Sequence, residues 1–332
     1  MPIRRKHVYL SVLSIITWML ICAQVSAQGT TGFEILRLQT HPRGSALAGA
    51  VIADAGNIES LYYNPAGLGT VDKRAASAGY MNYVLDIGSG YMSYIQPDPH
   101  WGGVWGVGLT YTNYGDFDGR SATGENLPTF SATDIVLNVA YAIHYREKFN
   151  IGLGGKFAYS EIESYTGSAL AFDLGAQYTL IADRMGLGAG IFNIGWTTKA
   201  FVDTKDSLPL YYRIGIWGTP EGLPAKLFFS MTLYEEYADN YSIGNLSGSG
   251  FLDLLGEIYY SAGAEFHPQD AVFLRIGYDT RGLDQKVGTR KDALAGICGG
   301  FGLDVGFIRM DYGLASYGEL GLVQRLSLSR SF

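Results

Sequence analysis

Few residues in this chain could carry chemistry, and their spacing fits no reaction. Four of the five histidines follow the first 27 residues without the spacing of metal ligands, so we expect them in turns or on the surface: His41, His100, His144 and His267. The Gly-x-Gly pairs lie inside predicted strands with no helix after them, which excludes a phosphate-binding loop. We expect four acidic residues to be solvated rather than to form a catalytic pair: Asp54, Glu59, Glu161 and Glu163.

Charge and cysteine content exclude several kinds of partner. The chain carries 24 basic and 31 acidic residues, whereas nucleic-acid binding needs a basic face. Residues 1–27 read as a cleaved signal peptide, with basic Arg4-Arg5-Lys6, an apolar run from Val8 to Cys22 and small residues before Gln28. Cleavage would leave Cys298 alone, so neither an intrachain disulfide nor a cysteine-based zinc site could form. We expect no metal, no cofactor and no nucleic acid.

From Ala75 to Phe332 the sequence reads as fourteen segments in which apolar residues alternate with polar or small ones. Between Ile135 and Tyr145 every second residue is large and apolar, and the residues between them are polar or small apart from Val136. Successive side chains of a strand point to opposite faces, so each segment has one apolar face. A soluble β-sandwich would show the same period.

The connections between the segments favour a barrel over a sandwich. Counted from Ala75, the even-numbered connections are compact, whereas the odd ones are mostly longer; the longest runs from Glu235 to Leu255, and only the first is short. Barrels inserted from the periplasm keep their inner turns small and elaborate their outer loops. We therefore predict an all-β fold, a 14-stranded antiparallel transmembrane β-barrel over residues 75–332.

Composition and the C-terminal strand also fit a barrel in the outer membrane of a diderm bacterium. Tyrosine, with 24 residues, gathers near segment ends as the aromatic girdles of such barrels do. Beyond the signal peptide, no stretch reaches the roughly 18 apolar residues of a spanning helix. Leu326, Leu328 and Phe332 resemble the signal that the outer-membrane insertion machinery reads. We expect membrane lipid and that machinery as partners.

Residues 28–74 differ from the barrel segments and predict a small N-terminal helical hatch, or plug. Small residues dominate from Gly44 to Ala55, and we expect this run to be flexible. A helical apolar pattern from Ile58 to Tyr62 precedes Asn64 and Pro65, where proline ends the helix and the asparagine can cap the next turn. A segment this short cannot form its own core, so we predict that it packs in the barrel lumen.

The run from Asn57 to Leu68 resembles the N-terminal motif of the PorV/PorQ family, which is related to the FadL, OmpP1 and TodX group of hydrophobic-compound channels. Further similar runs are Tyr111 to Gly119, Phe149 to Phe157 and Asp173 to Tyr178. The chain departs from the family pattern at residues 41–44. The resemblance implies a 14-stranded outer-membrane barrel that serves type IX protein secretion in Bacteroidetes-like bacteria. The hatch motif comprises Asn57, Tyr62, Tyr63, Asn64, Pro65, Ala66 and Gly67.

Two non-catalytic functions remain open. The first, which the resemblance implies, is a binding or scaffold component of surface secretion that holds secreted cargo. Its contact surface would be the longest loop, with Tyr241, Phe251 and Leu252, although a loop folded over the lumen explains these residues equally well. The second is a passive channel for small hydrophobic compounds, in which the hatch binds ligand or moves.

Two further features bear on these functions. In a channel, Gly186, Gly188 and Gly190 could kink the wall, although relief of strain in a curved sheet explains these glycines better. An enzyme is not expected. A membrane hydrolase needs a serine, a histidine and an acid on its outer wall, whereas His144 and His267 fall at the rim of short turns.

Overall fold

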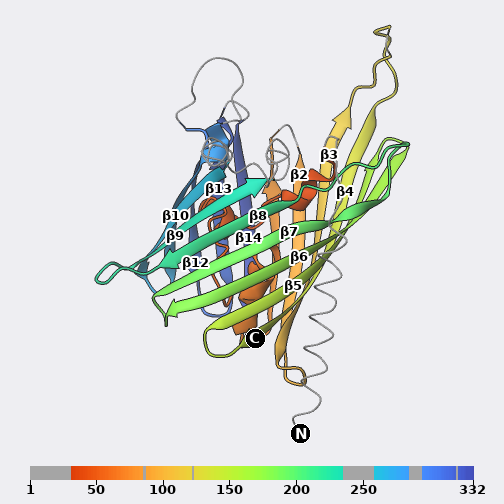
Figure 1. The fold of residues 1–332 in the computed structure, drawn as a ribbon. Coiled ribbons are helices and arrows are strands. Elements are labelled where there is room, and N and C mark those ends of the chain that lie inside the picture. The colour runs from red at the N-terminus through yellow and green to blue at the C-terminus, as the bar shows by residue number, and fades with distance from the viewer. Residues whose placement is uncertain (1–30, 85–86, 122, 235–257, 284–293, 319–320) are drawn as a thin grey trace, which may run out of the picture.

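The computed structural model describes residues 31–84, 87–121, 123–234, 258–283, 294–318 and 321–332. Its strands form one closed antiparallel barrel, in which each strand pairs with its neighbours along the chain and the first closes on the last (Figure 1). The prediction of a closed 14-stranded β-barrel is confirmed. The predicted signal peptide and the loop with Tyr241, Phe251 and Leu252 lie outside the described residues.

The first seven strands are β1 (Ala75–Asn82), β2 (Gly88–Asp98), β3 (Gly103–Phe117), β4 (Phe130–Tyr145), β5 (Phe149–Ile162), β6 (Tyr165–Ile181) and β7 (Met185–Lys199). The others are β8 (Tyr211–Gly218), β9 (Ala225–Tyr234), β10 (Ile258–Gln269), β11 (Val272–Asp279), β12 (Ile297–Asp304), β13 (Arg309–Ser316) and β14 (Leu322–Ser331). A short helix, η4 (Thr280–Leu283), follows β11.

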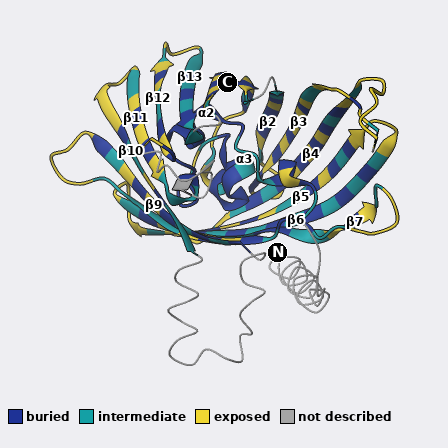
Figure 2. Ribbon diagram, turned by 90° about the horizontal axis from the view of Figure 1, so that it is seen from above, coloured by how far each residue is buried: buried dark blue, intermediate teal, exposed yellow. Residues whose placement is uncertain are grey.

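Along each strand, side chains alternate between the outer surface and the lumen, visible as alternating bands of exposure in Figure 2. In β4, Leu137 and Val139 are 41% and 42% exposed, whereas Asn138 and Ala140 are 5% and 3% exposed. The predicted apolar outer face of this segment is therefore confirmed. Among the described residues, no helix has the length and apolar character needed to cross a membrane.

Strand length and connection length both vary around the barrel. Strands β3 to β7 have 14 to 17 residues, whereas β8 and β11 to β13 have eight each. We call the rim with the even-numbered connections the inner rim and the opposite one the outer rim. The expectation that only the first outer connection is short was wrong. Glu163 and Ser164 alone join β5 to β6, because Glu163 takes the left-handed conformation (φ 56°) of a tight turn.

The hatch lies inside the barrel, as predicted (Figures 1 and 2). It contains η1 (Glu34–Arg37), α2 (Pro42–Ala46), α3 (Ser60–Tyr63) and η2 (Pro65–Thr70). Every residue from Thr40 to Asp54 is buried, and the expected flexibility of the run from Gly44 to Ala55 stays a prediction. Small side chains here let the hatch backbone pack directly against the wall.

Glycines on the lumen side of the wall make room for this packing. A Cβ atom on Gly152 would collide with the backbone of Pro65 and Ala66. One on Gly188 would lie 2.5 Å from the carbonyl oxygen of Ile52. The interpretation of Gly188 as strain relief in a curved sheet is therefore replaced by close approach of the hatch, which a side chain would prevent.

Candidate functional site

Asn64 is the residue that joins the parts of the hatch motif. Its Oδ1 accepts a hydrogen bond from the backbone N–H of Ala66 at 3.1 Å, which caps η2 as the sequence predicted. Its Nδ2 donates to the carbonyl oxygen of Ile52 at 2.8 Å and to that of Ala176 in β6 at 3.4 Å. One buried amide thus connects the α3–η2 turn, an earlier hatch segment and the barrel wall.

Other motif residues have local roles. The Oδ1 of Asn57 accepts from the backbone N–H of Ser60 at 3.1 Å, and its Nδ2 donates to Asp54 at 3.0 Å. Gly67 lies where a Cβ would approach the Ser60 hydroxyl to 2.5 Å. These contacts hold α3 against the segment before it. Tyr62 and Tyr63, in contrast, face a cavity on the outer side of the hatch.

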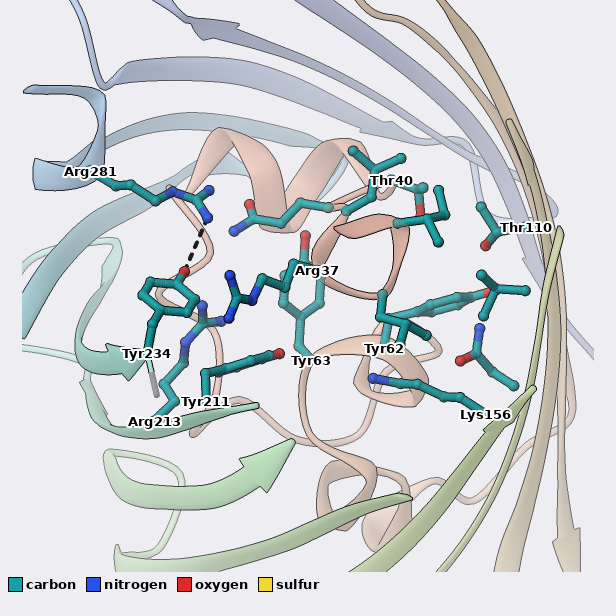
Figure 3. A pocket seen from close by; sticks show the side chains of 16 residues that line it. Arg37, Thr40, Tyr62, Tyr63, Thr110, Lys156, Tyr211, Arg213, Tyr234 and Arg281 are labelled. Carbon is teal, nitrogen blue, oxygen red and sulfur yellow. Dashed lines mark hydrogen bonds between the residues drawn. The ribbon is translucent and has the colours of Figure 1, made fainter. Parts of the chain in front are cut away.

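This outer cavity holds about 40 Å³ of space open to water and lies between the hatch, strands β3, β4, β5, β8 and β9, and η4 (Figure 3). It has room for about three water molecules. Its lining combines apolar, phenolic and basic side chains: Ile35, Leu36, Leu38 and Val136, then Tyr62, Tyr63, Tyr211 and Tyr234, then Arg37, Lys156, Arg213 and Arg281. The closed hatch therefore leaves no space here for a compound the size of an aromatic ring.

Most basic groups of the outer cavity have partners in its wall. The Lys156 ammonium lies 2.8 Å from an Asp173 carboxylate oxygen. Arg213 donates to the Thr232 hydroxyl at 2.8 Å and to the carbonyl of Gly49 at 3.4 Å, both neutral. The Tyr63 hydroxyl is buried and has no hydrogen-bond partner among the described residues. Burial raises the pKa of Tyr63 well above its usual value, so its hydroxyl stays protonated.

A larger vestibule of about 440 Å³ lies on the inner side of the hatch. It is bounded by the β12–β13 turn and by the ends of β10 and β14, which places its mouth at the inner rim. Its lining is densely charged and includes Arg43, Asp54, Glu59, Lys226, Glu265, Arg309 and Asp311. The hatch therefore separates a small outer cavity from a wide inner vestibule.

Buried ion pairs form the boundary between hatch and vestibule. Arg43 in α2 makes two hydrogen bonds to Glu265 in β10, of 2.9 and 3.0 Å, and lies 2.8 Å from Asp54. Arg275 lies 2.6 Å from Glu265, and Lys226 also pairs with Asp54. Each of these acids is at most 4% exposed.

The prediction of solvent exposure was wrong for two of the four acidic residues and for one histidine. Asp54 and Glu59 are buried against Arg43, whereas Glu161 and Glu163 are exposed as expected. His41 was expected in a turn or on the surface, but it is 1% exposed and lies between the rings of Tyr62 and Tyr91, with centroids at 4.5 and 3.9 Å. Burial lowers its pKa to about 3, so this imidazole is neutral. These errors share one cause: the hatch fills the lumen, so polar side chains inside the barrel are covered by protein and not by water.

The remaining candidate residues belong to the barrel wall and its rims, and the Nε2 atom of His267 lies 3.3 Å from a Glu265 carboxylate oxygen. His100, His144 and His267 are exposed. Among the described residues, no group of three or more histidine, cysteine, aspartate or glutamate side chains could hold a metal ion. The predicted insertion-signal residues lie on β14 and just after it, with Leu326, Leu328 and Phe332 exposed by 46%, 48% and 57%.

An apolar groove lies on the outer face of the barrel, across strands β6 to β9. It measures about 470 Å³ and is lined by Tyr178, Leu187, Ile214, Phe229 and Met231, among others, with Phe149 of β5 at its edge. Gly188 and Gly215, which pair across β7 and β8, form part of its floor. Cβ atoms on both glycines would meet Ile52 of the hatch. Only one layer of backbone therefore separates the hatch from this lipid-facing groove.

Comparison with known proteins supports the architecture. No protein-family model and no curated protein sequence matches the chain. Among solved structures, the chain is similar to the Pseudomonas putida toluene transporter TodX, with a TM-score of 0.59 at 12% identity over 91% of this chain and 98% of that one. It is similar to the Ralstonia pickettii toluene transporter TbuX, with a TM-score of 0.57 at 13% identity over 88% and 98%.

A third similar structure is a Pseudomonas aeruginosa FadL homologue, with a TM-score of 0.55 at 11% identity over 89% of this chain and 98% of that one. Identities this low establish a shared fold and nothing finer. They agree with the FadL group that the hatch motif resembles, and none of these similarities bears on the PorV/PorQ family itself.

Proposed function

We propose that this protein is a passive outer-membrane channel for small hydrophobic compounds, with a hatch that closes the lumen and must move for passage. The observation that carries the proposal is the division of the lumen. A docked hatch leaves about 40 Å³ on its outer side and about 440 Å³ on its inner side, with buried side chains between them. Space for a small compound therefore already exists on the inner side, and the hatch is the segment that closes the outer side.

Two surfaces support the substrate class: the lining of the outer cavity and the apolar groove on the lipid-facing side of the barrel. The similar structures are described as toluene transporters. In this chain, aliphatic and phenolic side chains line the outer cavity, and the groove on β6 to β9 is almost wholly apolar. Apolar lining with a few polar groups is typical of sites for small apolar ligands. No enzyme activity is proposed.

The test is to lock the hatch to the wall. Leu47 in the hatch faces Gly263 in β10, and a Cβ on Gly263 would lie 3.1 Å from the Leu47 Cβ. Disulfides need Cβ atoms about 3.5 to 4.5 Å apart, so a small shift allows a bond. We would make Leu47→Cys with Gly263→Cys in a Cys298→Ser background and express it in a diderm host, with cells that lack the protein as the measure of background toluene diffusion.

Uptake of labelled toluene at low concentration should be fast for the reduced double variant and should fall to the level of cells without the protein after oxidation. Adding reductant to the same cells should restore uptake, which controls for the loss of Leu47 packing. If oxidised and reduced cells take up toluene at equal rates above the background, the hatch does not gate passage. If no form exceeds the background, the channel proposal fails.

The secretion role stays a prediction that rests on the motif resemblance alone. Its proposed contact residues Tyr241, Phe251 and Leu252 are outside the described part of the chain, and no described contact favours it.

A further inference from the structure

Arg43 is the charged centre of the contact between hatch and wall. It is 7% exposed and comes from α2, in the middle of the hatch sequence. Its guanidinium meets Glu265 of the wall through two hydrogen bonds and meets Asp54 of the hatch on another side. Such a two-point contact fixes orientation as well as distance. Arg43 thus ties two hatch segments to one strand.

Glu265 has the matching role in the wall, because it also binds a second guanidinium. Arg275 of β11 lies 2.6 Å from Glu265 and 2.7 Å from Asp311. Removing the Glu265 charge would leave the guanidiniums of Arg43 and Arg275 facing each other without the anion between them. Arg43 would keep Asp54 and Arg275 would keep Asp311, but each guanidinium would lose a buried carboxylate partner, which is destabilising. The strain would fall on the hatch, since Arg275 is held in the barrel.

One other contact between hatch and wall is also an ion pair, that of Lys226 in β9 with Asp54, whereas the following ones differ in kind. Gln177 donates to the carbonyl oxygens of Ile52 and Asp54, and Arg325 donates to that of Gln39. Such bonds can be exchanged for water as the hatch leaves, at a modest net cost each. The buried pair of Arg43 and Glu265 cannot be exchanged so easily, because its two charges must be separated. It also borders the inner vestibule, so water reaches the broken pair from the inner rim.

We propose that Arg43 and Glu265 form a latch that holds the hatch in its closed position and that opens toward the inner vestibule. This inference rests on the proposed function for what the hatch gates, but the latch itself concerns only whether the hatch is docked. Loss of the charge on either residue shifts the hatch toward an undocked state while the barrel stays closed on itself.

The chain contains its own reporter of docking. Cys298 on β12 is 7% exposed and packs against Ala48 of the hatch. It is the one cysteine that follows residue 27. When the hatch leaves, the covering Ala48 leaves with it, and the thiol becomes accessible from the lumen. The rate at which a small maleimide labels Cys298 in the full-length protein, in detergent or in liposomes, therefore measures undocking without any transport assay.

The experiment compares three single variants with the native chain. Glu265→Gln removes the latch anion at nearly constant shape, and Arg43→Gln removes the cation from the hatch alone. Arg309→Gln is the matched control. Arg309 belongs to the same charged cluster but pairs with Asp311, 3.0 Å away on its own strand, and its removal leaves both pairs between hatch and wall. Heat-modifiable gel migration establishes that each barrel is folded.

Glu265→Gln should label at least tenfold faster than the native chain. Arg43→Gln should label faster as well but by a smaller factor, because Glu265 keeps Arg275, and Arg309→Gln should label at the native rate. The latch is overturned if Arg43→Gln labels at the native rate, or if Arg309→Gln is accelerated as much as the two latch variants. Should Glu265→Gln fail to fold, Arg43→Gln decides the question, since Arg43 is not part of any strand.

The two proposals can fail separately. Fast labelling of the latch variants without toluene uptake in any form would leave the latch standing and remove the channel function. Toluene uptake that depends on the Leu47–Gly263 lock, with equal labelling of all variants, would leave the channel and remove the latch.

Discussion

Glu59 should make hatch docking depend on pH. It is 7% exposed at the start of α3, one of its carboxylate oxygens has no hydrogen-bond partner among the described residues, and the nearest Arg43 nitrogen is 3.7 Å away. Burial raises its pKa from 4.5 to about 7, and Arg43 only partly offsets this. The charged groups and phenols that act on it or respond to it are Arg43, Arg275, Arg309, Asp311, Tyr63 and Tyr91.

The sign of the effect is set by where the proton is held. The docked hatch keeps Glu59 protonated up to about pH 7, whereas an undocked, hydrated Glu59 releases its proton near pH 4.5. Docking is therefore unaffected by Glu59 below pH 4.5, weakens as pH rises, and is weakest above pH 7. A rise of about 2.5 pKa units corresponds to an upper value of about 3 kcal/mol. Glu59→Gln removes the ionisable group and with it this loss.

The assay is the maleimide labelling of Cys298 in the native chain and in Glu59→Gln, each measured from pH 5 to pH 8.5. Taking the ratio of the two rates at each pH cancels the ionisation of the thiol itself. With these pKa values the native chain should label about fourfold faster than Glu59→Gln at pH 5, and this ratio should rise at least a further tenfold, roughly, by pH 8.5. A ratio that stays constant over this range would show that Glu59 is not buried with a raised pKa in the docked hatch, and the reasoning would be refuted.

Three further changes should act on the hatch alone. Asn64→Ala removes the bond to Ala66 and two bonds to carbonyl oxygens, so docking should weaken by about 1 to 3 kcal/mol, seen as faster proteolysis of the hatch in the folded barrel. Gly152→Val should expel the hatch and expose Cys298, whereas Gly155→Val on the same strand, where a Cβ finds no atom nearer than 4.0 Å, should label like the native chain. Tyr63→Phe removes a buried hydroxyl without a partner, so the same labelling assay should show docking unchanged or about 1 kcal/mol stronger.

The barrel could be predicted from the sequence because the alternation of apolar and polar residues is a local pattern that repeats in each strand. Each strand needs only a period of two, and the outward positions of β4, such as Leu137, keep it. The β5–β6 turn was missed because two residues, Glu163 and Ser164, carry almost no compositional signal. The hatch was found through the Asn64-Pro65 step, whose capping geometry is also local.

The charged contacts of the hatch could not be found in this way. Arg43 and Glu265 are 222 residues apart, and neither has a neighbour in sequence that marks it for burial. Asp54 was judged by its type, and acids are usually solvated. One available pattern was overlooked, namely the glycines that recur on the lumen side of the strands, such as Gly152, Gly175 and Gly188. Their positions indicate where the backbone of the hatch lies against the wall.

The path of the hatch restricts how the lumen can open. Near the outer rim, Gly32 donates to the carbonyl of Ser207, and Phe33, Ile35 and Leu36 pack with Leu208 of the β7–β8 connection. At the other end the chain enters β1 at Ala75 on the inner rim. Since both ends of the described hatch are held, at opposite rims, simple withdrawal of a free end does not clear the lumen.

Under the proposed function, opening begins instead in the middle of the hatch, between the outer cluster around Phe33 and the start of β1. Asn64 and Ala66 pack closely against Gly152 and Gly175 of the wall. These contacts depend on shape and carry no ionisable group, so we expect no response to pH. The Arg43–Glu265 pair and Glu59 lie in the same middle stretch, border the vestibule, and respond to charge. The segment that must move first is therefore the one whose docking depends on ionic groups, which is why the labelling of Cys298, opposite Ala48 in that stretch, is the decisive measurement.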